Sequence, residues 1–345
     1  MECSMADISF GRLLAGDVET VSKAYEKFSN QPVDLELVDG NGWGAPRKQR
    51  TIARPVTVKG PGTFFGKKTR TVTFEPTDME GWWFDRSDLP DSLPVRVSIR
   101  NVWTTGLVVS NIVLRSGSPH NYIRMVEHIV ALKMGMGIDN LMIRIDSGDP
   151  PLFQHGSLDL VEALESAGIK ELERPVQFVT VKEKVTVAGP NGAFLTLSPC
   201  SNEKPGLTID CAVDFKTAIR KQRIRFPVNY TNFRRGAEAR TNTSALKMLY
   251  CRTIGKLFAD VRNLGYTTEN ILVAGKFCYY NKPRLLHQGK SLEAAWHRAV
   301  LDLLAAVALI DEGQFLGDIV SYKAGHSLDV ETIRALYKQK LMRKI

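Results

Sequence analysis

The sequence predicts an α+β fold made of two halves with a similar order of elements. From residue 49 onward, short runs alternate apolar and polar residues, which is typical of strands. Segments with apolar residues at three- and four-residue steps follow and indicate helices. Pro175 begins a second pass of the same kind. Because each half would bury its helices on one face of a sheet, we expect a duplication packed face to face, with any functional site at the junction.

Residues 1–48 are predicted to be an extension and a linker. A short amphipathic helix fits residues 9–28, and the glycine-rich segment 39–46 then breaks the pattern. The helix could dock on the body of the protein or on a membrane surface. We therefore expect three parts, which are the extension 1–48, a first α+β domain at 49–172 and a second at 173–345.

The elements of the two domains follow from periodicity and from glycine and proline breaks. In the first domain we expect strands at residues 51–58, 70–74, 82–85, 95–99, 107–114 and 141–145, with helices at 121–136 and 158–167. In the second domain we expect strands at residues 176–187, 194–197, 207–213, 223–227 and 271–277, with helices at 241–264 and 292–309.

Composition limits the class of protein and its partners. Of the 345 residues, 43% are hydrophobic and 24% are charged, as in a globular protein. No apolar run approaches the roughly 20 residues that span a bilayer, and the N-terminus has no secretory pattern, so a cytoplasmic protein is expected. The net charge of +9 favours an anionic partner. Because no nucleic-acid-binding motif accompanies the basic residues, a nucleotide or a membrane surface is the better expectation.

Glu127 and His128 are candidates for metal chemistry. They stand side by side at the edge of the apolar stripe of the helix expected over residues 121–136. A neutral imidazole can bind zinc, and a neighbouring carboxylate can take a proton from a bound water molecule. Both residue types are also common on helix surfaces, so this pair alone does not establish a site.

Five dispersed motifs in order resemble the bacterial UDP-3-O-acyl-N-acetylglucosamine deacetylases, the zinc enzymes of lipid A synthesis. The resemblance covers about residues 49–340. The motifs are Gln49-Arg50-Thr51-Ile52 with the glycine loop at 60–68, Val126-Glu127-His128, Gly137-Ile138-Asp139-Asn140 with Ser166-Ala167-Gly168-Ile169, Arg252-Thr253-Ile254-Gly255, and Tyr322-Lys323-Ala324-Gly325-His326.

The resemblance implies a fold and a set of roles. Two α+β domains would hold their helices between their sheets, and one zinc ion would activate water against an N-acetyl group. His128 and Asp302 would be zinc ligands and Glu127 the general base. Thr253 would stabilise the oxyanion, and His326 would protonate the leaving amine or stabilise charge. Lys323, Phe64 and Ile254 match family positions near the substrate.

The second half of the metal site departs from the family pattern. The family has His-Lys-x-x-Asp on one helix, and a four-residue step places both ligands on one face. Here the position four residues before Asp302 is Arg298, which stays protonated and cannot bind zinc. His297 is the other candidate ligand, because a π-bulge could return it to the metal. In a regular α-helix, the five-residue step from His297 to Asp302 separates the two side chains by about 140°.

Three further departures fall on functional positions. Ala306 replaces an aspartate that pairs with the catalytic histidine in the family, so His326 would lack that carboxylate. Phe64 and Phe65 stand where the family has a histidine and a threonine near the substrate. Ile254 replaces a phenylalanine that lies against the nucleotide sugar.

Two hypotheses remain. In the first, the chain is a zinc hydrolase acting on a UDP-linked acylated glucosamine, with His297 or another residue such as His287 completing the metal site. In the second, it is an inactive relative that binds a nucleotide sugar, a lipid or a protein, with Arg298 in the place of the metal. Arg298 would then pair with Asp302 and with Glu127. The departures from the family pattern favour the second hypothesis.

Overall fold

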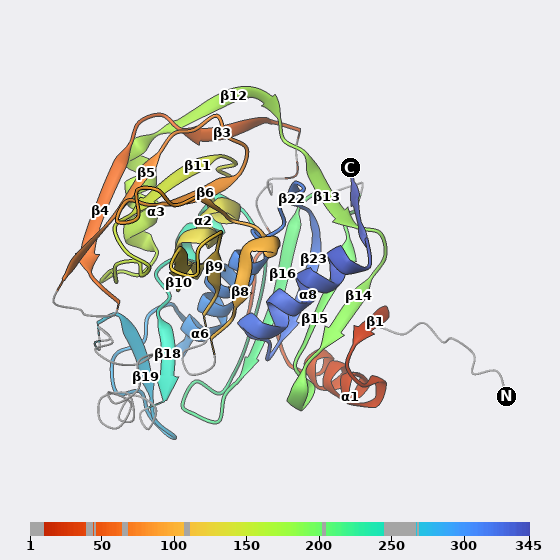
Figure 1. Ribbon diagram of the computed structural model, residues 1–345. Helices are drawn as coiled ribbons and strands as arrows, with labels where there is room; N and C mark the ends of the chain where they lie inside the picture. Colours follow the sequence, from red (N-terminus) through yellow and green to blue (C-terminus); the bar gives the residue numbers. More distant parts are fainter. Residues whose placement is uncertain are drawn as a thin grey trace.

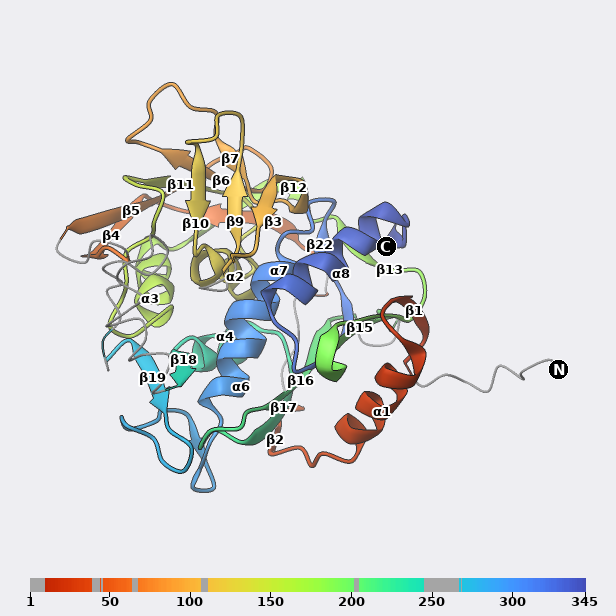
Figure 2. The ribbon, with the colours of Figure 1, turned by 60° about the horizontal axis from the view of Figure 1, so that its bottom comes forward.

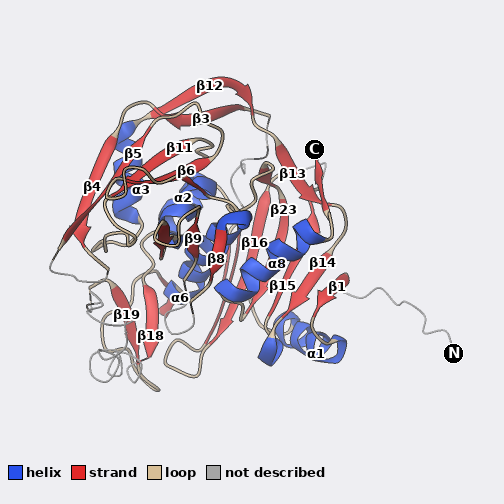
Figure 3. Cartoon of the chain, viewed as in Figure 1, coloured by secondary structure: helices blue, strands red, loops and turns tan. Residues whose placement is uncertain are grey.

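A computed structural model describes residues 10–38, 44, 46–63, 68–106, 111–201, 205–244, 267 and 269–345. Within these residues two large sheets combine with helices, so the predicted α+β class is confirmed (Figure 3). The internal duplication and the domain boundaries at residues 48 and 172 stay predictions.

The first large sheet is five-stranded and comes from the first half of the chain. Its order is β4 (Val56–Pro61), β5 (Thr69–Glu75), β11 (Leu141–Ile145), β6 (Trp82–Arg86) and β7 (Val95–Arg96). β11 is antiparallel to β5 and parallel to β6. Trp82 and Phe84 alternate with less buried residues and lie in the core, as the period of two in a strand requires.

The second large sheet is seven-stranded. Its order is β1 (Arg12–Ala15), β14 (Val185–Ala188), β15 (Phe194–Pro199), β23 (Gly317–Tyr322), β16 (Leu207–Asp214), β17 (Lys221–Pro227) and β2 (Leu35–Glu36). β16 is antiparallel to β17 and parallel to β23. Both edge strands come from the N-terminal segment and run parallel to their neighbours.

Smaller sheets and turns complete the strand inventory. They are β3 (Lys48–Ile52) with β12 (Ile169–Pro175), β8 (Val102–Thr104) with β9 (Val113–Arg115) and β10 (Tyr122–Arg124), β13 (Phe178–Val181) with β22 (Gln314–Phe315) and β24 (Met342–Lys344), β18 (Thr241–Ser244) with β19 (Ile271–Ala274), β20 (Leu286–His287) with β21 (Lys290–Ser291), and the 3₁₀ turns Ile99–Asn101 and Pro190–Gly192.

The helices lie mainly between the two large sheets. They are α1 (Val18–Ser29), α2 (Glu127–Met136), α3 (Leu158–Ala167), α4 (Tyr230–Gly236), α6 (Glu293–His297), a π-helical segment Arg298–Leu303 that we call the π-turn, α7 (Leu304–Val307) and α8 (His326–Lys338). Figures 1 and 2 show α2 and the continuous α6, π-turn and α7 between the sheets. One apolar cluster joins the inner faces of both sheets to the helices other than α1.

Two expected helices differ from the structure. The helix expected over residues 121–136 begins only at Glu127, because Tyr122–Arg124 forms β10 and pairs with β9. Met125 has a φ of 55°, a left-handed conformation that interrupts a helix. In the helix expected over residues 241–264, Thr241–Ser244 is instead a strand parallel to β19, and the remainder lies outside the described residues.

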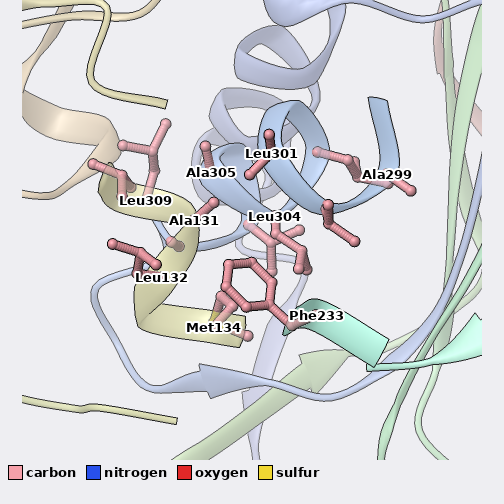
Figure 4. Packing of buried hydrophobic residues seen from close by; sticks show 14 of the residues in the cluster. Ala131, Leu132, Met134, Phe233, Ala299, Leu301, Leu304, Ala305 and Leu309 are labelled. Atoms are coloured by element: carbon pink, nitrogen blue, oxygen red, sulfur yellow. The ribbon is translucent and has the colours of Figure 1, made fainter. Parts of the chain in front are cut away.

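The close contact between α2 and α4 depends on Gly135. Figure 4 shows Phe233 of α4 beside Met134 of α2 and Leu304 of α7. A Cβ atom at Gly135 would lie 2.1 Å from the Phe233 ring, and the side chain of Phe233 is 1% exposed. The ring therefore has little room to move away from a larger side chain.

Gly135→Ala is expected to lower the free energy of unfolding by about 1–3 kcal/mol through overpacking. Urea unfolding and the melting temperature measure the effect. Gly206→Ala is the matched control, because nothing lies within 4 Å of a Cβ atom at Gly206. Equal stability of the two variants would contradict the close contact described for α2 and α4.

Within the extension and linker expected over residues 1–48, residues 12–36 are part of the second large sheet. β1 and β2 occupy opposite edges of that sheet, and α1 covers its outer face in a separate apolar cluster with Phe194 and Tyr322. Figure 2 shows α1 on the other side of the sheet from α8. Phe28 of α1 packs edge-on against both aromatic rings. Residues 12–36 therefore act as a strap across the sheet.

Phe28→Ala is expected to lower the free energy of unfolding by about 3–5 kcal/mol, because it leaves a cavity under the strap. Thermal unfolding followed by circular dichroism measures the change. Val18→Ala on the same helix is the control, since Val18 is 56% exposed. A Phe28→Ala protein as stable as the Val18→Ala protein would show that α1 does not support the sheet.

Candidate active site

Two imidazole rings meet where the first turn of α2 faces the end of α6. His128 Nε2 and His297 Nε2 are 3.3 Å apart. Thr241 Oγ1 of β18 lies 2.9 Å from the same nitrogen atom of His297. His297 is 5% exposed, so this meeting point is shielded from solvent on the His297 side. His128 is thus joined by a partner from the other half of the chain.

The π-turn brings His297 and Asp302 to the same side of their helix. In this segment, each turn closes over one more residue than in an α-helix, so residues five apart lie close together. His297 Nδ1 is 3.5 Å from Asp302 Oδ1 as a result. The π-bulge that the spacing of these residues required is therefore present.

Glu127 and His326 lie on the other side of Asp302. Glu127 begins α2, and its carboxylate accepts the backbone N–H of Ile112. His326 begins α8, and its Nε2 lies 3.5 Å from Asp302 Oδ1 and 3.9 Å from Glu127 Oε1. Among the described residues, the buried Nδ1 atom of His326 has no hydrogen-bond partner, which agrees with the alanine at position 306. Glu127, Asp302 and His326 thus form one group, in which Glu127 and His326 are buried and Asp302 is partly buried.

Burial sets the protonation of these groups. Burial raises the pKa of Glu127. Burial, and then the neighbouring His297, lower the pKa of His128 to about 3, so its imidazole is neutral. Burial acts to raise the pKa of Asp302, but His297 and His326 hold it below its ordinary value. The site therefore combines a neutral imidazole with an ionised carboxylate, which are two common zinc ligands.

Arg298 pairs with a carboxylate that was not among the predicted site residues. Its guanidinium donates to both carboxylate oxygens of Asp329 on α8, and one of these contacts measures 2.7 Å. The expected pairing of Arg298 with Asp302 and Glu127 is therefore wrong. Burial acts to lower the pKa of Arg298, but Asp329 and then Asp302 raise it above its ordinary value.

The other predicted site residues divide into two groups. Lys323 is exposed, and its ammonium donates to the carbonyl of Asn191 over 3.3 Å. His287 lies in the β20–β21 hairpin opposite Lys290. Phe64, Thr253 and Ile254 lie outside the described residues.

Sequence reasoning did not single out Asp329 or Thr241. The spacing of Asp329 could have indicated it. Asp329 follows His326 by three residues, so the two side chains lie on the same face of a helix, and it stands between the apolar residues Leu328 and Val330. Thr241 carried no comparable signal, since its segment was expected to be the start of a helix.

The two imidazoles fit a zinc ion. Two nitrogen ligands of one tetrahedral zinc at about 2.0–2.1 Å lie roughly 3.3 Å apart, which is the separation of His128 Nε2 and His297 Nε2. Asp302 provides the right chemistry for a third ligand, although its carboxylate is directed at His297 Nδ1 and His326 Nε2. In the described segments, no three His, Cys, Asp or Glu side chains already converge on one metal position.

Comparison with known proteins supplies the family. The profile of the UDP-3-O-acyl N-acetylglycosamine deacetylases matches residues 49–338. The chain belongs to this deacetylase family. The family's enzymes in Psychrobacter sp. (strain PRwf-1) and Hahella chejuensis are similar to it, at 30% identity over 298 residues and 27% over 294. These alignments cover 84% and 85% of this chain and 92% and 91% of the two relatives.

A third member of the deacetylase family, from Brucella ovis, is 28% identical over 293 residues, which are 84% of this chain and 94% of that relative. Each of the three relatives is named a UDP-3-O-acyl-N-acetylglucosamine deacetylase. The family match begins at residue 49, so the strap formed by residues 12–36 lies outside it. No helix of the described segments has both the length and the apolar character needed to cross a membrane.

Proposed function

We propose that this chain hydrolyses the N-acetyl group of a UDP-linked 3-O-acylated N-acetylglucosamine. The observation that carries the proposal is that His128 Nε2 lies 3.3 Å from His297 Nε2, while Asp302 lies against the other ring nitrogen of His297 and against His326, next to Glu127. These five residues come from both halves of the chain and lie together between the sheets, with Glu127, His297 and His326 buried and His128 and Asp302 partly buried. A purely structural role would not require so many titratable groups in a low-dielectric interior.

His128, His297 and Asp302 would hold the zinc ion. When bound, zinc polarises the acetyl carbonyl and lowers the pKa of a water molecule. Glu127 would act as the general base, because its carboxylate is buried beside His326 and Asp302 and its pKa is raised by burial. His326, whose Nε2 lies 3.9 Å from Glu127 Oε1, would protonate the leaving amine. In this scheme, the hydroxyl group of Thr253 would donate a hydrogen bond to the developing oxyanion.

The substrate would contact the residues around this buried group. Lys323 presents an exposed ammonium three residues before His326, which suits the diphosphate of a UDP-sugar. By their match to family positions, Phe64 and Ile254 would contribute apolar side chains to substrate binding. A peripheral membrane contact and a cytoplasmic location remain predictions that agree with an acylated nucleotide substrate.

The inactive alternative depended on Arg298 neutralising Asp302 and Glu127. Because Arg298 pairs with Asp329 instead, that role is unfilled, and His297 occupies the position beside His128. The geometry therefore supports hydrolysis better than binding alone.

Zinc content tests the proposal. The purified protein is expected to hold about one zinc ion per chain and to lose it to a chelator with the fold intact. Elemental analysis before and after dialysis measures the ratio. A folded protein that cannot be loaded with zinc would reject the proposed chemistry.

A further inference from the structure

The π-turn buries a charged side chain that the metal site does not use. Arg298 directly follows His297, and it is 5% exposed. A guanidinium at this depth needs a charged partner, because an uncompensated buried charge is strongly unfavourable. The position of that partner therefore fixes the position of the Arg298 side chain and, with it, the orientation of the π-turn.

That partner is Asp329, which is fully buried. Arg298 Nη1 donates to Asp329 Oδ2 over 2.7 Å, and Arg298 Nη2 donates to Asp329 Oδ1. Arg298 Nη2 also lies 3.4 Å from Ser321 Oγ of β23. The two parallel contacts fix the guanidinium plane as well as its distance, as is typical of paired arginine and carboxylate groups.

The ion pair connects two of the elements that carry the candidate site, the π-turn and α8. Asp329 lies in the first turn of α8, and its backbone N–H donates to the carbonyl of Gly325 over 3.0 Å. His326 begins the same turn. Arg298, the other member of the ion pair, directly follows His297 in the chain and precedes Asp302 by four residues. The pair thus ties the π-turn to the helix that positions His326.

We propose that Arg298 and Asp329 are positioning residues that keep the extra residue of the π-turn in place. With the pair intact, His297 and Asp302 share one side of the helix. Without it, the segment can relax to an α-helix, in which the step from His297 to Asp302 is about 140°. The relevance to zinc rests on the proposed function, whereas the effect on helix geometry does not.

The main test is the double variant Arg298→Met/Asp329→Leu, which removes both charges and keeps apolar volume. Replacing a whole buried ion pair in this way often leaves stability unchanged or higher. We expect a melting temperature close to that of the wild type, zinc affinity weaker by about 10- to 100-fold, and a regular α-helix across residues 298–303 in a crystal structure. Chelator competition measures the affinity.

Two further variants complete the test. Arg298→Lys keeps the charge but loses the two-pronged contact, and it is expected to weaken zinc binding less than the double variant. Arg223→Met/Asp210→Leu is the matched control, because Arg223 Nε and Nη2 each donate to Asp210 over 2.8 Å on β16 and β17. This control can change the melting temperature but is expected to leave zinc affinity unchanged.

A folded double variant that keeps both the π-turn and the wild-type zinc affinity would overturn the proposal. Wild-type protein that binds no zinc would reject the proposed function instead. In that case the crystal structure of the variant decides this inference alone, and a retained π-turn overturns it. If the double variant does not fold, the Arg298→Lys variant is the test. An Arg298→Lys protein with both the zinc affinity and the π-turn of the wild type would overturn the proposal.

Discussion

His297→Gln is expected to weaken zinc binding by about 10³-fold, because one of three ligands that together supply roughly 10–16 kcal/mol is lost. Deacetylation should fall with the zinc content. The fold should persist, since the glutamine amide can still bond to Thr241 Oγ1, which lies 2.9 Å from His297 Nε2. Zinc titration with a chelating indicator and circular dichroism measure the two properties.

His120→Gln is the control for this variant, because His120 is exposed in a turn of the first half of the chain. It should bind zinc as the wild type does. Unchanged zinc affinity in His297→Gln would show that His297 is not a ligand, and the alternative ligand His287 would then need testing.

Glu127→Gln is expected to lower kcat by about 10²- to 10⁴-fold, the usual contribution of a general base. Zinc should remain bound, since Glu127 is not among the proposed ligands. The amide oxygen of glutamine can still accept the backbone N–H of Ile112 that Glu127 accepts, so the start of α2 should be preserved. Initial rates with a zinc-loaded protein measure the effect.

Glu312→Gln serves as the control, because the side chain of Glu312 is 45% exposed and lies in a surface ion pair with Arg100. A Glu127→Gln protein that loses its zinc would indicate a ligand instead of a base. A zinc-loaded protein with unchanged kcat would remove Glu127 from the mechanism.

Much of the sheet architecture could be predicted because strands with one buried face carry a clear period of two. The strand at Leu141–Ile145 and the helix at Leu158–Ala167 have the bounds expected from the sequence. The N-terminal strap could not be predicted, because β1 and β2 are short edge strands whose partners, Val185–Ala188 and Lys221–Pro227, are far away in the sequence. Local patterns do not contain such pairings.

For the candidate site, the sequence supplied the residues but not their arrangement. Glu127, His128, Asp302 and His326 were found from motifs, and the structure brings them together. The position of Arg298 could not be predicted, because it depends on a buried partner 31 residues away. From the sequence, the π-turn was considered only as the geometry that His297 would need to reach the metal. The spacing of residues in a helix does not distinguish a regular helix from one with a bulge.

Release of acetate from UDP-3-O-acyl-N-acetylglucosamine by the purified, zinc-loaded protein tests the central claim most directly. Our account predicts one acetate and one free amine per substrate consumed, loss of this activity on treatment with a chelator, and recovery on adding zinc. A folded, zinc-loaded protein that binds the nucleotide sugar but releases no acetate would contradict it.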